Sequence, residues 1–159
     1  MSNRKDHGVW LIIAGVLIAV AAAFVYIILP NLPQSKVSLQ FGDGVFHASV
    51  AADDNSRAKG LSGVTKLASD QALLMIFPKE DKWGIWMKDM KIPIDIVWLN
   101  SDKKVVYIVK NASPDVSTSE TFTPKSVAKY VIELPAGTVD GKAIGTNTTA
   151  IFQTDMKGI

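Results

Sequence analysis

The chain has 159 residues, of which 48% are hydrophobic, with 17 basic residues, 15 acidic residues, two histidines and no cysteine. This length suits one domain with an appendage. The nearly balanced charge and the lack of a basic block argue against nucleic acid as a partner. Without cysteine, disulfides, thiolate metal sites and cysteine nucleophiles are excluded.

The segment from Val9 to Leu29 is apolar throughout and carries no charge. As a helix rising about 1.5 Å per residue, it would span roughly 30 Å, the thickness of a bilayer's hydrocarbon core. The sequence therefore predicts a transmembrane helix at residues 9–29, after a short N-terminus at 1–8. A cleaved signal peptide is the alternative, with a small-residue cleavage site at Ala21-Ala22-Ala23. The apolar run exceeds the usual h-region of about 7–15 residues, which favours an uncleaved signal anchor.

The flanking charges predict the orientation of this span. Arg4 and Lys5 precede it, and the first basic residue after it is Lys36. The positive-inside rule then places residues 1–8 in the cytoplasm and the rest outside it. Pro30 and Pro33 end the helix and make residues 30–35 a short stalk. We expect a single-pass protein of the cell membrane, which contacts the bilayer through residues 9–29 and presents residues 36–159 outside the cytoplasm.

After the stalk, the pattern changes to short apolar runs separated by turn signals. Alternating residues such as Leu39 and Phe41 indicate a strand, and Gly42-Asp43-Gly44 indicates a hairpin loop. A short helix is expected before Gly60, and a long polar loop at 110–125. No βαβ alternation is apparent. The sequence predicts a mostly β, sandwich or barrel-like domain with one or two short helices. Its strands are expected at 37–41, 45–51, 72–77, 84–88, 94–99, 105–109, 127–134 and 148–153.

A carboxylate inside an apolar strand is the most unusual local feature. Asp95 follows Pro93-Ile94 and precedes Ile96-Val97-Trp98-Leu99. Both faces of this strand are apolar, so we expect it to be central and covered on both sides. A buried carboxylate without a partner costs several kcal/mol. One hypothesis is structural, with an ion pair to Lys88 or Arg57 or with the backbone N–H groups after Pro93 as donors. The other is that Asp95 lines a ligand pocket with Trp86 and Lys88.

Glu133 raises a similar question in the strand 127–134. It shares a face with Val127, Lys129 and Val131, and a solvated strand face would explain both charged residues. The alternative is a role for Glu133 in a site. Together with Asp95 it could form the acid–base pair of a glycoside hydrolase, if the two carboxyl groups face each other.

Four motifs in this order resemble the uncharacterised family called domain of unknown function 192. That family's pattern contains R-x-x-G-L-M, G-M-L-F-x-F, W-M-K-N-T-x-I-P-L-D-I and Y-V-L-E-x-x-A-G. The resemblance covers residues 36–152, and the central motif is its most specific part. The matching positions are Arg57, Gly60, Trp86, Met87, Lys88, Pro93, Asp95, Glu133 and Gly137.

The resemblance implies a small, mostly β domain, often exported or membrane-attached in bacteria and archaea, and brings no established activity. Three departures from the pattern stand out. Ser62 replaces the Met after Gly-Leu, Ala72-Leu73 replaces Gly-Met, and Asp89-Met90 replaces Asn-Thr. A negative charge at Asp89 weakens any inference about a ligand shared with the family.

Three functional hypotheses follow. The preferred one is a non-catalytic binding or envelope-accessory module for a sugar or peptide, without metal or cofactor. The second is a carboxylate-based hydrolase of envelope polysaccharide. The third is a purely structural domain whose partners bind elsewhere; the sequence does not indicate an oligomeric state. The candidate ligand-binding residues are Arg57, Trp86, Lys88, Asp95 and Glu133.

Overall fold

The computed structural model describes residues 14, 16–17, 36–116 and 121–153. The chain divides into two units, Met1–Gln34 and Ser35–Ile159, and every element named below belongs to the second. The predicted span 9–29 and stalk 30–35 lie almost entirely outside the described residues. Within the part of the chain that is described, no helix combines the length and hydropathy needed to cross a membrane.

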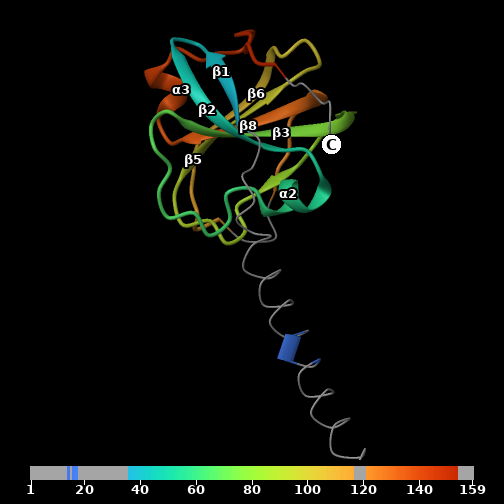
Figure 1. The fold of residues 1–159 in the computed structure, drawn as a ribbon. Helices are drawn as coiled ribbons and strands as arrows, with labels where there is room; N and C mark the ends of the chain where they lie inside the picture. Colours follow the sequence, from blue (N-terminus) through green and yellow to red (C-terminus); the bar gives the residue numbers. More distant parts are fainter. Residues whose placement is uncertain (1–13, 15, 18–35, 117–120, 154–159) are drawn as a thin grey trace, which may run out of the picture. The chain divides into compact units, whose positions relative to one another are not determined.

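The second unit is a mostly β domain with two short helices, as the sequence predicts (Figure 1). Its main sheet has six strands in the order β1-β2-β3-β8-β5-β6, and β4 and β7 form a separate pair. The helices are α2 (Asp54–Lys59) and α3 (Thr138–Gly141). The strands are β1 (Lys36–Phe41), β2 (Gly44–Ala51), β3 (Gln71–Asp81), β4 (Ile85–Trp86), β5 (Ile94–Leu99), β6 (Val105–Ala112), β7 (Thr121–Phe122) and β8 (Ala128–Pro135).

The connection from β2 to β3 differs from the prediction. The two strands are parallel, with His47 paired to Gln71 and Ala51 to Met75, and α2 lies in the crossover between them. The sequence therefore contains one βαβ unit where none was expected, and the sheet is mixed. All other strand pairs in the sheet are antiparallel. The prediction missed this unit because α2 has only six residues, none of them buried, and so it lacks an apolar periodicity.

Both faces of the main sheet are covered, so alternate residues of one strand belong to two separate cores. In β5 every residue is buried. Val97 and Leu99 belong to the first core, whereas Ile94, Ile96 and Trp98 belong to the second. This confirms the prediction of a central strand that is apolar on both sides. The second core also holds Ile85 of β4 and Leu61 after α2, so these segments cover that face.

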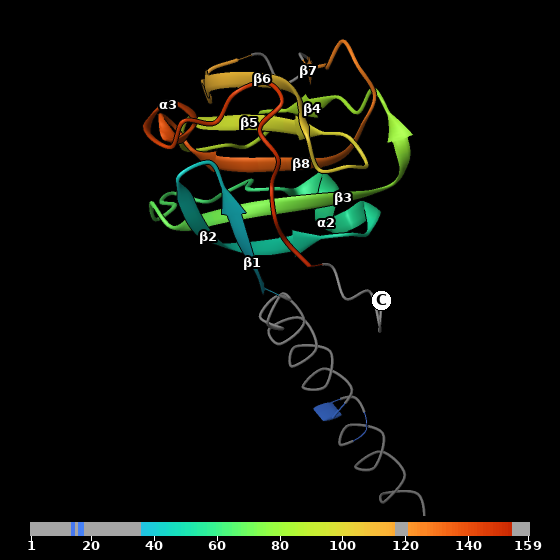
Figure 2. The same ribbon diagram turned by 90° about the horizontal axis from the view of Figure 1, so that it is seen from above.

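Residues 149–151 reach both edges of the main sheet (Figure 2). Thr149 forms a bridge with Lys104, next to edge strand β6, and Ile151 forms one with Gln40 of edge strand β1. The predicted last strand at 148–153 is thus reduced to two isolated bridges. Similarly, the predicted loop at 110–125 contains the end of β6 and the short strand β7.

Candidate functional site

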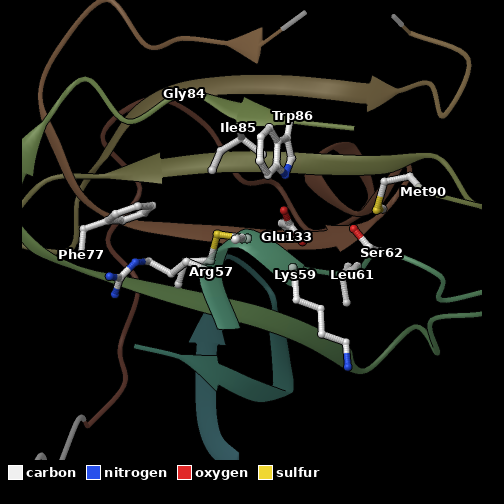
Figure 3. A pocket seen from close by; sticks show the side chains of 13 residues that line it. Arg57, Lys59, Leu61, Ser62, Phe77, Gly84, Ile85, Trp86, Met90 and Glu133 are labelled. Carbon is white, nitrogen blue, oxygen red and sulfur yellow. The ribbon is translucent and has the colours of Figure 1, made fainter. Parts of the chain in front are cut away.

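A cavity of about 220 Å³ lies over the second core, between α2 with its following loop and strand β4 (Figure 3). This volume corresponds to about seven water molecules at their liquid density. The walls are mostly apolar, with Met75 and Phe77 from β3 and Ile85 from β4. Residues from separate parts of the sequence line it: Arg57, Ala58, Lys59, Gly60, Leu61, Ser62, Met75, Phe77, Gly84, Ile85, Trp86, Met90 and Glu133.

Glu133 supplies a carboxyl group to the cavity from the middle of the sheet. Its strand β8 lies between β3 and β5, where Glu133 is paired with Leu73 and Ile96. Only 3% of the residue is exposed, so the predicted solvated strand face is wrong at this position. Lys129, on the same face, is half-buried and donates from Nζ to the Pro78 carbonyl oxygen at 2.8 Å. Glu133 is covered by α2, the loop after it and β4, which are distant in the sequence. The residue pattern of β8 alone therefore could not indicate its burial.

The Glu133 carboxyl is incompletely paired. Its Oε2 atom is buried and has no hydrogen-bond partner among the residues that the structure describes. Burial raises the pKa of this carboxyl to about 8, because the apolar surroundings disfavour the charged form. The group is therefore mostly protonated at neutral pH, and it can act as a hydrogen-bond donor. Figure 3 shows it below Trp86 and beside the residues of α2.

Trp86 and Lys88 lie near the mouth of the cavity. Trp86 is 42% exposed and lines the cavity. Lys88 is exposed, with its Nζ 5.9 Å from the centroid of the Trp86 ring, and it does not line the cavity. Its backbone carbonyl oxygen instead accepts a hydrogen bond from Ser62 Oγ at 2.8 Å. The loop after α2 is thereby tied to the loop after β4.

Arg57 lines the cavity, but its guanidinium group is already engaged. It donates to Asp54 Oδ1, to the Ala52 carbonyl oxygen and, at 2.7 Å, to the Ile76 carbonyl oxygen. It also lies 5.3 Å from the centroid of the Phe77 ring. These contacts hold α2 against the middle of β3. Arg57 therefore forms part of the cavity wall, with its guanidinium group ion-paired to the exposed Asp54.

Gly60 makes room for the Glu133 carboxyl. It ends α2 with φ 51° and ψ −132°, a conformation that residues with a Cβ rarely adopt. A Cβ atom here would lie 3.3 Å from Met75 Cε and 3.7 Å from Glu133 Oε2. Gly60 thus allows the backbone turn after α2 and leaves the space above the Glu133 carboxyl open.

Asp95 is not part of this cavity. It is fully buried, and its two carboxyl oxygens accept hydrogen bonds from the backbone N–H groups of Asn111 and Val139, each at 2.8 Å. This agrees with a structural role and with backbone donors, but the donors come from β6 and α3, not from the residues after Pro93 as predicted. Neither Lys88 nor Arg57 forms an ion pair with Asp95 among the described residues, so these predicted partners are wrong.

Asp95 and Glu133 also point to opposite faces of the sheet. Asp95 is paired with Leu134, which belongs to the first core, whereas Glu133 is paired with Ile96 of the second core. Directly paired residues of antiparallel strands share a face. The sheet itself therefore separates the two carboxyl groups, and they cannot act together across one glycosidic bond.

Of the five sequence-predicted site residues, the structure brings three together at one cavity: Arg57, Trp86 and Glu133. Sequence reasoning missed the apolar walls supplied by Met75, Phe77, Ile85 and Met90. Their residue types carry no signal for a site, since such side chains are ordinary core residues. The one signal that could have indicated these residues was their position in or beside the family motifs.

Comparison with known proteins identifies a shared family. The model of domain of unknown function 192, described as "Uncharacterized ACR", matches residues 37–151, which confirms the resemblance carried by the motifs. The UPF0127 protein of Thermococcus gammatolerans is 33% identical over 102 residues, 60% of each chain. A UPF0127 protein of Thermococcus kodakarensis is 32% identical over 101 residues, 59% of this chain and 58% of the relative. The chain thus spans about 60% of the length of these curated relatives.

Two solved structures share the fold. A crystal structure from Sinorhizobium meliloti, described as a candidate transcription regulator, superposes with a TM-score of 0.72 at 23% identity. The superposition covers 76% of this chain and 96% of the Sinorhizobium chain. A protein of unknown function from Novosphingobium aromaticivorans gives a TM-score of 0.66 at 23% identity, with 73% and 83% covered. At this identity the likeness concerns the fold alone.

Proposed function

This chain belongs to the family called domain of unknown function 192, and from that premise we propose that its β domain is a non-catalytic binding module whose ligand occupies the cavity over Glu133. One observation carries the proposal. Residues that match the family pattern in three separate motifs, Arg57 with Gly60, Trp86, and Glu133, all line this one cavity.

The energetics of Glu133 support a ligand rather than a purely structural role. A buried polar atom without a hydrogen-bond partner costs about 1–3 kcal/mol. An apolar residue of similar volume at this position would avoid that cost. Asp95 presents the contrast, since both of its oxygens are paired and its contribution to the fold is evident. A carboxyl group kept unpaired in a cavity is more readily explained by a partner from outside the chain.

Hydrolysis by paired carboxylates is not favoured, because Asp95 and Glu133 lie on opposite faces of the sheet. Regulation of transcription through DNA binding is not favoured for this chain either, although the Sinorhizobium structure is described as a candidate transcription regulator. The chain has 17 basic against 15 acidic residues, and its sequence contains no basic block of the kind that favours DNA binding.

Methionine methyl groups provide a direct test of binding. Met75 and Met90 line the cavity, whereas Met87 is buried outside it. The full chain, labelled with ¹³C at its methionine methyl groups, is titrated in detergent micelles with single-ring compounds such as toluene and acetophenone. We expect the Met75 and Met90 resonances to shift and that of Met87 to stay in place. Unchanged Met75 and Met90 signals with every compound at millimolar concentration would refute the binding site.

The membrane anchor and the external location of the domain belong to the same proposal. They rest on the uncharged segment 9–29 and on its flanking charges. Because the chain has no cysteine, single cysteines can report topology. A membrane-impermeant maleimide applied to intact cells should label the exposed position of Asp102→Cys. Ser2→Cys should react only after lysis, and the opposite pattern would show that the domain faces the cytoplasm.

A further inference from the structure

The polar groups of the cavity are unequally available to a ligand. Ser62 Oγ is engaged with the Lys88 carbonyl oxygen, and the guanidinium of Arg57 is engaged with Asp54 and two backbone carbonyl oxygens. Lys59 is exposed, and Figure 3 shows its side chain directed away from Glu133. Among the described lining residues, the Glu133 carboxyl is thus the inner polar group that still lacks a partner.

The charges around the cavity restrict the ligand further. Arg57 and Lys59 line it, and Lys88 lies over Trp86 near its mouth. No acidic residue other than Glu133 lines the cavity among the described residues. A cationic ligand would meet these positive groups, and an anionic one would have to give up its hydration to enter mostly apolar walls. A neutral ligand avoids both penalties.

We propose that the cavity selects a small neutral molecule with an apolar body and a carbonyl oxygen at its inner end, which accepts a hydrogen bond from the Glu133 carboxyl. This inference rests on the proposed function and adds the chemical class of the ligand. The apolar walls, which include Met75 and Ile85, would enclose the body of the molecule. A volume of about 220 Å³ admits roughly one ring with a short substituent.

Four single-ring probes separate the classes: acetophenone is neutral with a carbonyl, toluene is apolar, benzylamine is cationic and benzoate is anionic. Each is titrated into the full chain at pH 6.5, with the methyl resonances of Met75 and Met90 as the readout. We expect acetophenone to bind about tenfold more tightly than toluene, as one net hydrogen bond would give. Benzylamine and benzoate should bind more weakly than acetophenone.

Two substitutions of Glu133 test the hydrogen bond itself. In Glu133→Gln the side-chain amide can still donate, so the affinity for acetophenone should stay within about threefold of the wild type. In Glu133→Leu the donor is lost, so acetophenone should bind about tenfold more weakly and no better than toluene. If Glu133→Leu does not fold, a titration above pH 9 replaces it. The ionised wild-type carboxylate can no longer donate, whereas Glu133→Gln should show no change with pH.

The outcomes distinguish this inference from the proposed function. Toluene binding as tightly as acetophenone, or acetophenone binding unaffected by Glu133→Leu, overturns the carbonyl assignment and leaves the cavity as a binding site. Tightest binding by benzylamine overturns the neutral class in the same way. Failure of all four probes to move Met75 and Met90 overturns both the inference and the proposed function.

Discussion

Asp95 stabilises the domain through two buried hydrogen bonds. Its carboxyl joins β5 to the N–H groups of Asn111 and Val139 in a fully buried position. Asp95→Asn replaces one acceptor by an amide NH₂ group that would face a backbone donor. Since hydrogen bonds to a charged group contribute about 1.5–3 kcal/mol each, we expect a loss of roughly 2–4 kcal/mol in the free energy of unfolding. Urea unfolding followed by tryptophan fluorescence measures it.

Lys88→Met is the matched comparison for this prediction. Lys88 is exposed, and its main side-chain contact is the ring of Trp86. An exposed cation–π contact contributes about 0.5–1 kcal/mol at most. The two substitutions should therefore differ clearly in effect. Equal, large losses for both would indicate an Asp95–Lys88 ion pair that the structure does not contain.

Glu133 should make the stability fall as the pH rises. Its pKa is about 8 in the folded chain, against 4.5 as the ordinary value, so the folded state holds a proton that the unfolded state releases. Stabilisation by this proton is complete below pH 4.5 and is lost as the pH rises to about 8. At about 1.4 kcal/mol per pKa unit, the change amounts to several kcal/mol, with about 5 kcal/mol as a ceiling.

Glu133→Gln isolates this effect from the other titrating groups. The pKa values of Asp53 and Glu80 are lowered by hydrogen bonds, and both groups remain in the variant. The difference in unfolding free energy between wild type and variant should therefore report Glu133 alone. We expect the free energy of unfolding of the variant to rise relative to that of the wild type between pH 5 and 8. A difference that stays constant over this range would mean that Glu133 titrates normally.

The sequence predicts more about Asp95 than about Glu133, and the reason is where the covering residues come from. The strand around Asp95 is apolar on both faces, so its burial follows from its own pattern. Glu133 has Lys129 on its face, which reads as a solvated surface. Its burial depends on α2, the following loop and β4, which pack over it from distant positions in the sequence. Such non-local covering leaves no trace in the strand itself.

Among the elements, the turn after α2 is the one that controls access to the carboxyl. Gly60 and Gly63 both have positive φ, 51° and 78°. In Gly60→Ala, the added Cβ would approach Met75 and Glu133, and the backbone would be strained by about 1–3 kcal/mol. In Gly63→Ala nothing lies within 4 Å of the Cβ, so only the cost of the left-handed conformation, about 1–2 kcal/mol, applies.

We therefore expect Gly60→Ala to weaken binding of acetophenone, whereas Gly63→Ala should leave it unchanged. Stability and binding are measured on the same preparations, by urea unfolding and by the Met75 and Met90 resonances. If the two variants weaken binding equally, the turn matters only through its backbone strain, and the space above Glu133 is not needed by the probe.

The crossover that contains α2 shows why the mixed sheet was missed while its strands were found. The strands β3 and β5 have long apolar runs, and their positions follow from them. The pairing of β2 with β3 in parallel depends on the path of the chain between Ala51 and Gln71. That segment is long enough for a crossover, but its one helix has six residues and none of them is buried, so its pattern does not indicate one.

At the scale of the whole domain, the segment after α3 links the two edges of the main sheet. Ala150 donates to the Lys103 carbonyl oxygen at 2.9 Å, beside β6. Ile151 and Gln40 of β1 exchange two hydrogen bonds of 2.8 and 2.9 Å. Because β1 and β6 are at opposite ends of the strand order, a single short segment can join them only if the sheet curls around the first core. Closing both edges in this way also protects them from pairing with other chains.

This closure predicts that a core residue near the C-terminus stabilises the domain as a whole. Phe152 is 3% exposed, belongs to the first core and packs edge-on against Tyr130, with ring centroids 5.3 Å apart. Phe152→Ala should lower the free energy of unfolding by about 3–5 kcal/mol. Its neighbour Ile151 is 62% exposed, so Ile151→Ala should change it by no more than about 0.5 kcal/mol.

The form of the Phe152→Ala transition tests whether the closing segment belongs to the cooperative core. If it does, urea unfolding followed by tryptophan fluorescence and by far-UV circular dichroism should give one coincident transition at a lower midpoint. Of the four tryptophans, Trp98 lies in the second core and Trp83 packs against it, on the opposite face of the sheet from Phe152. The part of the fluorescence that these two contribute reports whether the loss crosses the sheet. A separate early transition that leaves the fluorescence unchanged would instead make the segment a local appendage.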